Sequence, residues 1–357
     1  MMLLDKKIYI IAEAGVNHNG KLSIAKKLIK AAKKAGASAI KFQSFSAENL
    51  VTKNSKKAPY QIKNTRNKDT QYKMLKKLEL KTSDYYAIKN YSKKLKIDFI
   101  SSVFDEESIS FLIKKMKSKI IKIPSGEITN YLILKKLDLN SSFIILSTGM
   151  ANLKEIADAV NTISNSKIYK FKNNKIKIIN KKKLNKLKNK LIILHCVTDY
   201  PVIDKYANLK SIETLQKELK INIGYSDHTL GILAPIIAVS KGAKVIEKHI
   251  TLNKKMSGPD HLASLEPDEF EEMVKNIKKF EEMIGSGKKI LQKCELKNIN
   301  VARKSIVAKK LINKNDKFSF ENLTSKRPGN GISPMKIKEL INTKSKKKYR
   351  PDQIVKI

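Results

Sequence analysis

Lysine and hydroxyl side chains fall within or directly after short apolar segments of this 357-residue sequence. Lys41 and Lys122 each interrupt an apolar, β-branched segment, so we interpret them as functional rather than as surface lysines. Ammonium groups beside hydroxyls bind phosphate or carboxylate groups. The predicted hydroxyl partners are Ser102, Ser125, Ser147 and Ser226. These residue types predict a site for a small anion.

Two histidines, His228 and His249, end two neighbouring apolar segments. Two imidazoles in such positions can bind a divalent metal ion and leave coordination positions open for substrate and water. Histidines at strand ends also serve as ordinary hydrogen-bonding residues, and their positions alone favour neither interpretation. The carboxylates of Glu13, Glu127 and Asp260 are candidates for proton transfer or for binding sugar hydroxyls.

The elements that must position these residues alternate regularly. Eight apolar, β-branched segments are predicted strands, and segments with helical periodicity lie between most of them. The predicted strands are Lys7–Ala12, Ala39–Phe42, Asp98–Ser102, Ile120–Ile123, Phe143–Ser147, Leu191–His195, Ile221–Gly224 and Val245–Lys248. The predicted helices include Leu22–Ala35, Glu106–Lys117, Leu153–Ile163 and Ile232–Lys241. This pattern predicts an α/β fold, a (β/α)8 TIM barrel, with a doubly wound open sheet as the alternative. Barrel enzymes carry their active sites at the carboxyl ends of the strands, where the polar residues fall here, so we expect an enzyme.

Lysine dominates the charge of the chain. Lys and Arg total 74 against 33 Asp and Glu, a formal net charge of +41, and only four of the 74 are Arg. Nucleic-acid recognition favours arginine, so we interpret the lysines as a solvated surface and expect no specific nucleic-acid partner.

The apolar segments are too short to cross a membrane and no signal-peptide pattern is evident, so we expect a cytoplasmic protein without a membrane partner. Two cysteines are too few for a disulfide framework, and Cys196 is interpreted as a packed small side chain. His18 and His195 are interpreted as structural residues.

The sequence divides into three predicted parts. Residues 1–284 hold the barrel units, residues 285–300 form a linker, and residues 301–357 form a small unit of short strands and turns. The segment 165–190 breaks the alternation, because it holds eleven Lys among its 26 residues and no acidic residue. We predict that it is a solvated insertion, or an extended helix and loop, before the sixth strand.

Several motifs resemble those of the sialic acid synthase family, in the same order and over essentially the whole chain. They are Ile11–His18, Lys122–Glu127, Ser147–Met150, Gly224–Thr229, Glu247–His249 and Gly258–Asp260. Lys326–Gly331 resembles part of the SAF (antifreeze-like) domain of that family. The resemblance implies a (β/α)8 barrel followed by a small β-rich SAF domain. It also implies a domain-swapped homodimer, in which the partner's SAF domain caps the barrel mouth.

The resemblance implies a role for each candidate residue. His228 and His249 would bind a divalent metal, Mn²⁺ in the first place, with Mg²⁺ or Co²⁺ as alternatives. The residues that would hold phosphoenolpyruvate are Lys41, Ser102, Lys122, Ser125, Ser147 and Ser226. The residues that would hold the open-chain sugar are Gln43, Glu127, Tyr200 and Asp260, with Arg327 reaching in from the other subunit. The catalytic residues would be Glu13, Glu127, Lys41 and Lys122.

The activity that the resemblance implies is that of a phosphoenolpyruvate-dependent transferase that forms a carbon–carbon bond with an N-acetylated hexose. The main prediction is N-acetylneuraminate (sialic acid) synthase, which uses N-acetylmannosamine and water and releases phosphate. The alternative is N,N'-diacetyllegionaminate synthase, which uses 2,4-diacetamido-2,4,6-trideoxymannose. Pseudaminate synthase and a non-catalytic SAF-containing binding protein rank below these two. The segment Ser257–His261 is closer to the first two branches than to the pseudaminate branch, and it does not separate those two.

Overall fold

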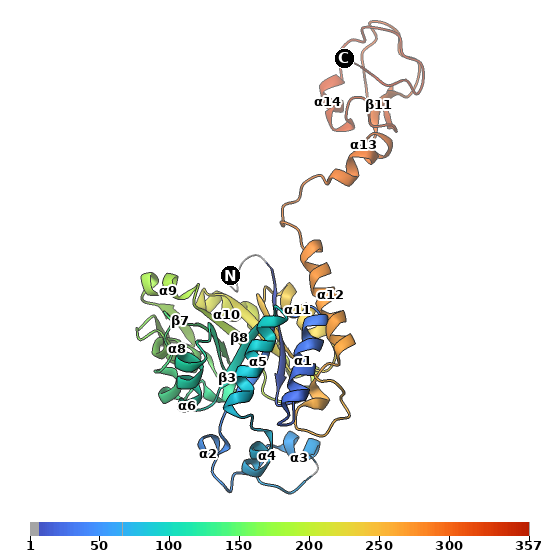
Figure 1. Cartoon of the computed structure of the whole chain (residues 1–357). Coiled ribbons are helices and arrows are strands. Elements are labelled where there is room, and N and C mark those ends of the chain that lie inside the picture. Colours follow the sequence, from blue (N-terminus) through green and yellow to red (C-terminus); the bar gives the residue numbers. More distant parts are fainter. Residues whose placement is uncertain (1–6, 66, 357) are drawn as a thin grey trace. The chain divides into compact units, whose positions relative to one another are not determined.

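The computed structural model describes residues 7–65 and 67–356, which form two compact units, one ending at Ile284 and one beginning at Gly285 (Figure 1). The first unit is a closed barrel of eight parallel strands in the order β1-β10-β9-β8-β5-β4-β3-β2. The strands are β1 (Tyr9–Gly15), β2 (Ala39–Ser44), β3 (Asp98–Val103), β4 (Ile120–Ile123), β5 (Phe143–Ser147), β8 (Leu191–Cys196), β9 (Ile223–Asp227) and β10 (Val245–His249). All eight predicted strands overlap these eight, and the predicted TIM barrel is confirmed.

Helices surround the barrel and bury their apolar faces against it. In α1, the buried residues Ala25, Leu28, Ile29 and Ala32 follow the spacing of one helix face. The principal helices are α1 (Leu22–Lys34), α5 (Thr82–Lys94), α6 (Glu106–Ser110), α7 (Tyr131–Leu134), α8 (Leu153–Ile163), α10 (Ser211–Leu219), α11 (Leu233–Ser240) and α12 (Pro267–Met283). Short 3₁₀ turns are η2 (Ser125–Glu127), η3 (Asp204–Tyr206) and η4 (His261–Ala263). The helix predicted for 106–117 is present as α6, continued directly by a π-helical turn, η1 (Phe111–Lys115).

The barrel interior changes from apolar to polar along the strands. A cluster of buried apolar residues fills the part nearer the amino ends of the strands, contributed by Tyr9, Ile11, Ala39, Ile100, Ile145, Ile192, Leu194 and Val245. Side chains in a strand alternate between the two faces of the sheet, so the next inward position lies two residues later. That position is Glu13 after Ile11, Lys41 after Ala39 and Ser147 after Ile145. The same alternation that packs the core therefore delivers polar groups to the carboxyl end of the barrel.

The connection between β2 and β3 is long and carries three short helices before α5. They are α2 (Ala47–Leu50), α3 (Pro59–Thr65) and α4 (Gln71–Leu78). In Figure 1 they gather at the carboxyl end of the barrel, below the strands. Asn64 on α3 donates a hydrogen bond from its Nδ2 to the Pro259 carbonyl oxygen at 2.6 Å, which ties this connection to the loop after β10.

The lysine-rich segment 165–190 differs from its prediction. It forms an antiparallel hairpin of β6 (Tyr169–Lys172) and β7 (Lys175–Ile178), followed by α9 (Lys181–Leu187). Tyr169 and Leu184 are buried, and the Tyr169 hydroxyl donates to the Leu219 carbonyl oxygen at 2.6 Å. The segment is thus packed against the barrel helices on one side, while most of its lysines are exposed on the other.

The second unit has its own apolar core, made by Ile306, Ala308, Ile312, Phe318, Leu323, Leu340, Tyr349 and Val355. The strands β11 (Ser305–Ala308) and β12 (Leu323–Lys326) pair antiparallel. The remaining elements are η6 (Pro334–Lys336) and α14 (Ile337–Leu340). The predicted linker is partly helical, because η5 (Lys293–Glu295) and α13 (Leu296–Ala302) lie in or overlap residues 285–300.

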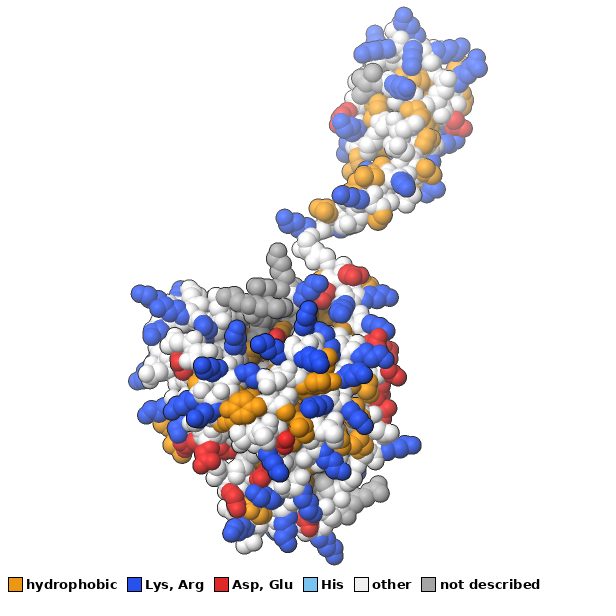
Figure 2. All heavy atoms as spheres, in the orientation of Figure 1, with side chains coloured by type: hydrophobic (Ala, Val, Ile, Leu, Met, Phe, Trp, Pro, Cys, Tyr) orange, Lys and Arg blue, Asp and Glu red, His pale blue; other side chains and the backbone are white. Residues whose placement is uncertain are grey.

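The exposed surface is rich in lysine. On the face that Figure 2 shows, Lys and Arg side chains are scattered over both units rather than gathered in one patch. Within residues 7–65 and 67–356, no helix combines the length and the apolar character that a membrane crossing requires.

Candidate active site

A cavity of about 280 Å³ opens among the carboxyl ends of the barrel strands. It is lined by every candidate residue of the barrel, namely Glu13, Lys41, Gln43, Ser102, Lys122, Ser125, Glu127, Ser147, Tyr200, Ser226, His228, His249 and Asp260. The structure therefore brings these side chains together, although it does not test the role of each. Arg327 lies in the second unit, where its Nε donates to the Ala302 carbonyl oxygen at 3.0 Å. Its predicted contribution from a partner subunit stays a prediction.

The base of the cavity is a buried network of two lysines and two glutamates, which we call the charged floor: Glu13, Lys41, Lys122 and Glu247. The Lys41 ammonium lies 3.0 Å from Glu13 Oε2 and 3.6 Å from Glu247 Oε2. The Lys122 ammonium lies 3.4 Å from Glu247 Oε1. All four side chains are almost completely buried, so their charges interact strongly with one another and with any bound anion.

Glu247 is a site residue that the sequence analysis missed. It also accepts a hydrogen bond from the Ser226 hydroxyl at 2.8 Å, which links β9 and β10 within the floor. Its position two residues before His249 on one strand was the available signal, because residues two apart share a face of the sheet.

The two glutamates of the floor have pKa values displaced in opposite directions. Burial raises the pKa of Glu13 to about 7, with the Glu247 charge adding to this and Lys41 opposing it. Burial would also raise the pKa of Glu247, but Lys122, Lys41 and the Ser226 hydroxyl outweigh it and lower that pKa to about 2. Glu13 can therefore exchange a proton near neutral pH, while Glu247 stays ionised.

The two histidines stand side by side above the floor, with ring centroids 5.4 Å apart. His228 donates a hydrogen bond from Nδ1 to the Val197 carbonyl oxygen at 2.8 Å. Its Nε2 therefore carries the lone pair that can bind a metal ion. His249 Nδ1 is buried without a hydrogen-bond partner in the described part of the chain, 4.0 Å from Asp260 Oδ2. Two imidazoles with one unsatisfied nitrogen each fit a divalent metal ion. In the described residues no group of three or more His, Cys, Asp or Glu is arranged as a metal cluster.

A buried clamp behind the histidines holds β9 and β10 together. The Lys248 ammonium lies 2.6 Å from Asp227 Oδ2 and donates 2.5 Å to the Thr229 carbonyl oxygen. Asp227 Oδ1 accepts from the Thr229 amide and from the Tyr225 hydroxyl, both at 2.9 Å. Asp227 and Thr229 flank His228, and Lys248 precedes His249. The clamp therefore fixes the backbone from which both imidazoles project.

The cavity also concentrates polar atoms that lack partners. Nine buried side-chain atoms of the described residues have no hydrogen-bond partner, and five of them belong to residues that line this cavity. Glu13 Oε2 and Glu247 Oε2 are ion-paired with the Lys41 ammonium, so the atoms that lack any partner among the described residues are those of Ser147, Thr198 and His249. Buried polar atoms are nearly always paired in folded proteins, so such a concentration indicates groups that a ligand satisfies.

Aromatic rings and a carboxylate close one side of the cavity. The Tyr200 ring lies 4.0 Å from the His228 ring and 4.8 Å from that of Tyr60 on α3, measured between centroids. Glu127 Oε2 accepts from Asn130 Nδ2 at 2.7 Å, and burial raises the Glu127 pKa. Cys196, interpreted from the sequence as packing, also lines the cavity, with its Sγ 3.8 Å from His228 Nδ1.

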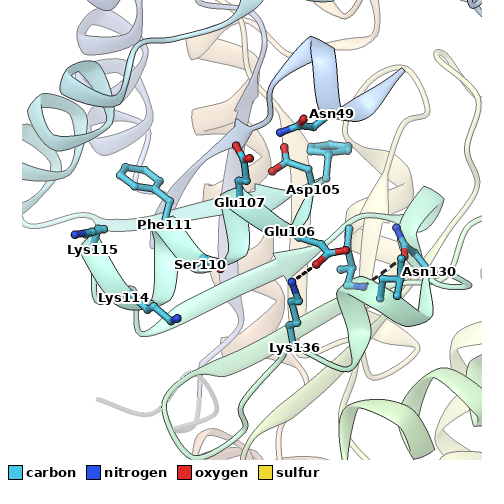
Figure 3. Close-up of a pocket in the computed structure, with 13 residues that line it drawn as sticks. Asn49, Asp105, Glu106, Glu107, Ser110, Phe111, Lys114, Lys115, Asn130 and Lys136 are labelled. Atoms are coloured by element: carbon cyan, nitrogen blue, oxygen red, sulfur yellow. Dashed lines mark hydrogen bonds and ion pairs between the residues drawn. The ribbon is translucent and has the colours of Figure 1, made fainter. Parts of the chain in front are cut away.

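A larger cavity of about 820 Å³ lies beside this one, between α2, α6, η1 and α7 (Figure 3). Two of the carboxylates that line it have partners among the described residues. Glu106 pairs with Lys136, and Asp105 accepts from the Ser46 and Ser108 amides. None of the unpartnered buried atoms of the described residues belongs to it. The smaller cavity at the strand ends is therefore the candidate active site.

The chain is a (β/α)8 barrel that places lysines, carboxylates and two histidines at the carboxyl ends of its strands. Since barrel enzymes carry their active sites there, the fold and the site define a barrel enzyme that binds an anionic substrate. The sequence model of the NeuB family matches residues 28–289, and that of the SAF domain matches residues 303–357. The chain belongs to the NeuB family, which confirms the family and the two-part architecture expected from its motifs. It is an enzyme, a phosphoenolpyruvate-dependent synthase of nine-carbon sugar acids.

Two relatives are similar over nearly the whole chain. An N,N'-diacetyllegionaminic acid synthase of Campylobacter jejuni is 46 % identical over 98 % of this chain and 99 % of its own length. An enzyme of the same name from Legionella pneumophila is 44 % identical over 94 % of this chain and 90 % of its own. The crystal structure of an N-acetylneuraminic acid (sialic acid) synthetase from Leptospira borgpetersenii is 32 % identical, with a TM-score of 0.66 over 82 % of this chain and 90 % of that one.

Proposed function

We propose that the chain is an N,N'-diacetyllegionaminate synthase, which condenses phosphoenolpyruvate with 2,4-diacetamido-2,4,6-trideoxymannose and water. The observation that supports this is the identity of 46 % and 44 % to two enzymes of that name, against 32 % to one named for N-acetylneuraminic acid. The proposal takes the alternative of the sequence analysis in place of its main prediction. We further propose that the enzyme acts in the cytoplasm.

Phosphoenolpyruvate is bound at the charged floor. Lys41 and Lys122 supply two buried positive charges, and the hydroxyls of Ser102 and Ser147 lie among the lining residues. Buried, preorganised ammonium groups stabilise the charge that develops on a departing phosphate far better than they would in water. Because the Glu13 pKa is near 7, protonation of Glu13 limits the negative charge that the bound anion meets.

The reaction forms a bond between C3 of phosphoenolpyruvate and the aldehyde carbon of the sugar, water adds at C2, and phosphate leaves by C–O cleavage. Glu13 and Glu127 are the proposed groups for proton transfer, because both line the cavity and burial raises the pKa of each. Gln43 donates to Glu13 Oε1 at 3.1 Å and so orients that carboxyl group. Tyr200 and Asp260 contact the sugar.

His228 and His249 hold a divalent metal ion, with Mn²⁺ the first candidate. Bound there, such an ion would supply Lewis-acid polarisation of the sugar aldehyde. The hydrogen bond from His228 to the Val197 carbonyl oxygen and the clamp around Asp227 orient these imidazoles. We also propose a domain-swapped homodimer in which Arg327 of one subunit serves the pocket of the other.

The test is product identification with purified protein, phosphoenolpyruvate and Mn²⁺, with each sugar supplied separately. The proposal expects phosphate release and a nine-carbon keto acid, identified by mass spectrometry, from 2,4-diacetamido-2,4,6-trideoxymannose. A product from N-acetylmannosamine alone would restore the main sequence prediction, and phosphate release with neither sugar would contradict both.

A further inference from the structure

One face of α4 forms part of the cavity lining. Residues 71, 74, 75 and 78 recur at the three- and four-residue spacing of one helix face, and all four line the cavity. They are Gln71, Met74, Leu75 and Leu78, and we call this face the α4 wall. Three of the four are apolar, so the wall differs sharply from the charged floor that bounds the same cavity.

The α4 wall continues into an apolar cluster. Its members are Val16, Phe45, Leu50, Met74, Leu75, Leu78 and Phe104, and every one of them lines the cavity. They come from the ends of β1, β2 and β3 and from α2 and α4, so a continuous apolar surface faces the ligand from one side.

Lysine is excluded from this surface although it is abundant elsewhere. The eight residues of α4 include Lys73, Lys76 and Lys77, and all three are exposed on the other face of the helix. Among the described residues that line the cavity, the only lysines are Lys41 and Lys122, both in the floor. Met74, Leu75 and Leu78 therefore offer no polar partner to a hydroxyl group, and Gln71 is the one polar side chain of the wall.

The position of the reaction decides which end of the sugar meets the wall. The aldehyde carbon must reach phosphoenolpyruvate at the floor, so the remote carbons of the open-chain sugar extend toward the rest of the lining. N-acetylmannosamine ends in a hydroxymethyl group, whereas the trideoxy sugar ends in a methyl group. A hydroxyl buried against an apolar surface loses its hydrogen bonds to water without replacement, while a methyl group gains contact.

We propose that the α4 wall selects acceptor sugars that lack the C6 hydroxyl, by packing Met74, Leu75 and Leu78 against the terminal methyl group. This inference rests on the proposed function and assigns its acceptor preference to particular residues. The selected feature is the deoxygenated end of the sugar, independent of the acetamido group at C4.

The first test uses the unmodified enzyme and two sugars that differ by one oxygen atom. N-acetylmannosamine and its 6-deoxy analogue, 2-acetamido-2,6-dideoxymannose, are compared by kcat/KM at saturating phosphoenolpyruvate. The inference expects the 6-deoxy sugar to be better by roughly tenfold or more. Equal values, or a preference for the hydroxyl, would overturn it while leaving the proposed function intact, because the C4 acetamido group could still give the preference.

The second test makes the wall polar with little change of shape. In Leu75→Gln and Met74→Gln, the ratio of kcat/KM for the trideoxy sugar to that for N-acetylmannosamine should fall roughly tenfold. KM for phosphoenolpyruvate should not change, and Lys73→Gln on the exposed face of the same helix should leave the ratio unaltered. Equal losses for both sugars would mean a merely structural role and would overturn the inference. A wild-type preference for N-acetylmannosamine would instead contradict the proposed function, and the inference with it.

Discussion

The charged floor and the α4 wall bound one cavity, yet they are built by different means. The floor comes from barrel strands, where Glu13, Lys41 and Glu247 occupy inward positions set by the two-residue period. The wall comes from a short helix inserted between β2 and β3. A strand position cannot move without disturbing the barrel, whereas α4 lies outside the barrel strands, so its cavity-facing residues can differ without changing the barrel. The contrast suggests that the floor carries the chemistry common to the family and the wall carries the choice of sugar.

Removal of a floor charge gives the largest expected effect. Lys122→Met should lower kcat about 10³-fold with either sugar, because the departing phosphate loses a preorganised positive charge. Phosphate release under steady-state conditions measures this. Lys119→Met, an exposed lysine just before the same strand, is the matched control and should keep the wild-type rate. If Lys122→Met retained more than a tenth of the activity, the assignment of the floor to phosphate would be wrong.

The clamp behind the histidines should affect stability more than any surface ion pair. Lys248→Met leaves the Asp227 carboxylate buried without its cation, which should cost about 3 kcal/mol in the free energy of unfolding. Urea denaturation followed by circular dichroism measures this cost, with the exposed Lys244→Met as the control. Mn²⁺ affinity should fall as well, since the clamp orients both imidazoles.

The double variant Asp227→Asn/Lys248→Met separates the buried charge from packing. It should recover part of the stability lost in Lys248→Met, because no unpaired charge remains buried. A double variant as unstable as the sum of the two single variants would show that the pair does not act as a unit.

His18 is a buried residue outside the cavity lining. It should have a smaller effect, which is on the pH dependence of the free energy of unfolding. Burial lowers its pKa to about 4, and its Nδ1 accepts from the Gly20 amide at 3.0 Å. The unfolded chain binds the proton near pH 6.5 and the folded chain does not, so stability falls as the pH drops from 6.5 toward 4. The loss should reach roughly 2 kcal/mol by pH 5. His18→Asn keeps a hydrogen-bond acceptor and should lose less stability than wild type between pH 7 and pH 5. Equal losses would show that His18 does not carry this effect.

The barrel could be predicted from the sequence because its signal is repeated eight times. Each strand is a short apolar segment, and a polar residue at its end, such as Lys41 or Lys122, marks the carboxyl edge. The α4 wall could not be found in this way. Its four residues are recognisable as one helix face only once the helix is known, and nothing local says that this face meets the strand ends rather than the barrel surface.

The lysine-rich insertion shows how composition can hide a pattern. The run Lys175-Ile176-Lys177-Ile178 alternates with the period of a strand, and the structure forms β7 there. The density of lysine masks this alternation, because a lysine-rich run also has the composition of a solvated segment. Glu247 was missed for a related reason, because the metal-binding role predicted for His249 was not extended to the residue two positions earlier on the same face.

A competition experiment tests the central claim most directly. Phosphoenolpyruvate, Mn²⁺ and equal concentrations of N-acetylmannosamine and 2,4-diacetamido-2,4,6-trideoxymannose are supplied to the enzyme in one reaction. The ratio of the two keto-acid products, measured by mass spectrometry at low conversion, equals the ratio of the two kcat/KM values. A pocket with a charged floor and an apolar wall predicts at least a tenfold excess of the diacetyllegionaminate product. An equal mixture, or an excess of N-acetylneuraminate, would contradict it.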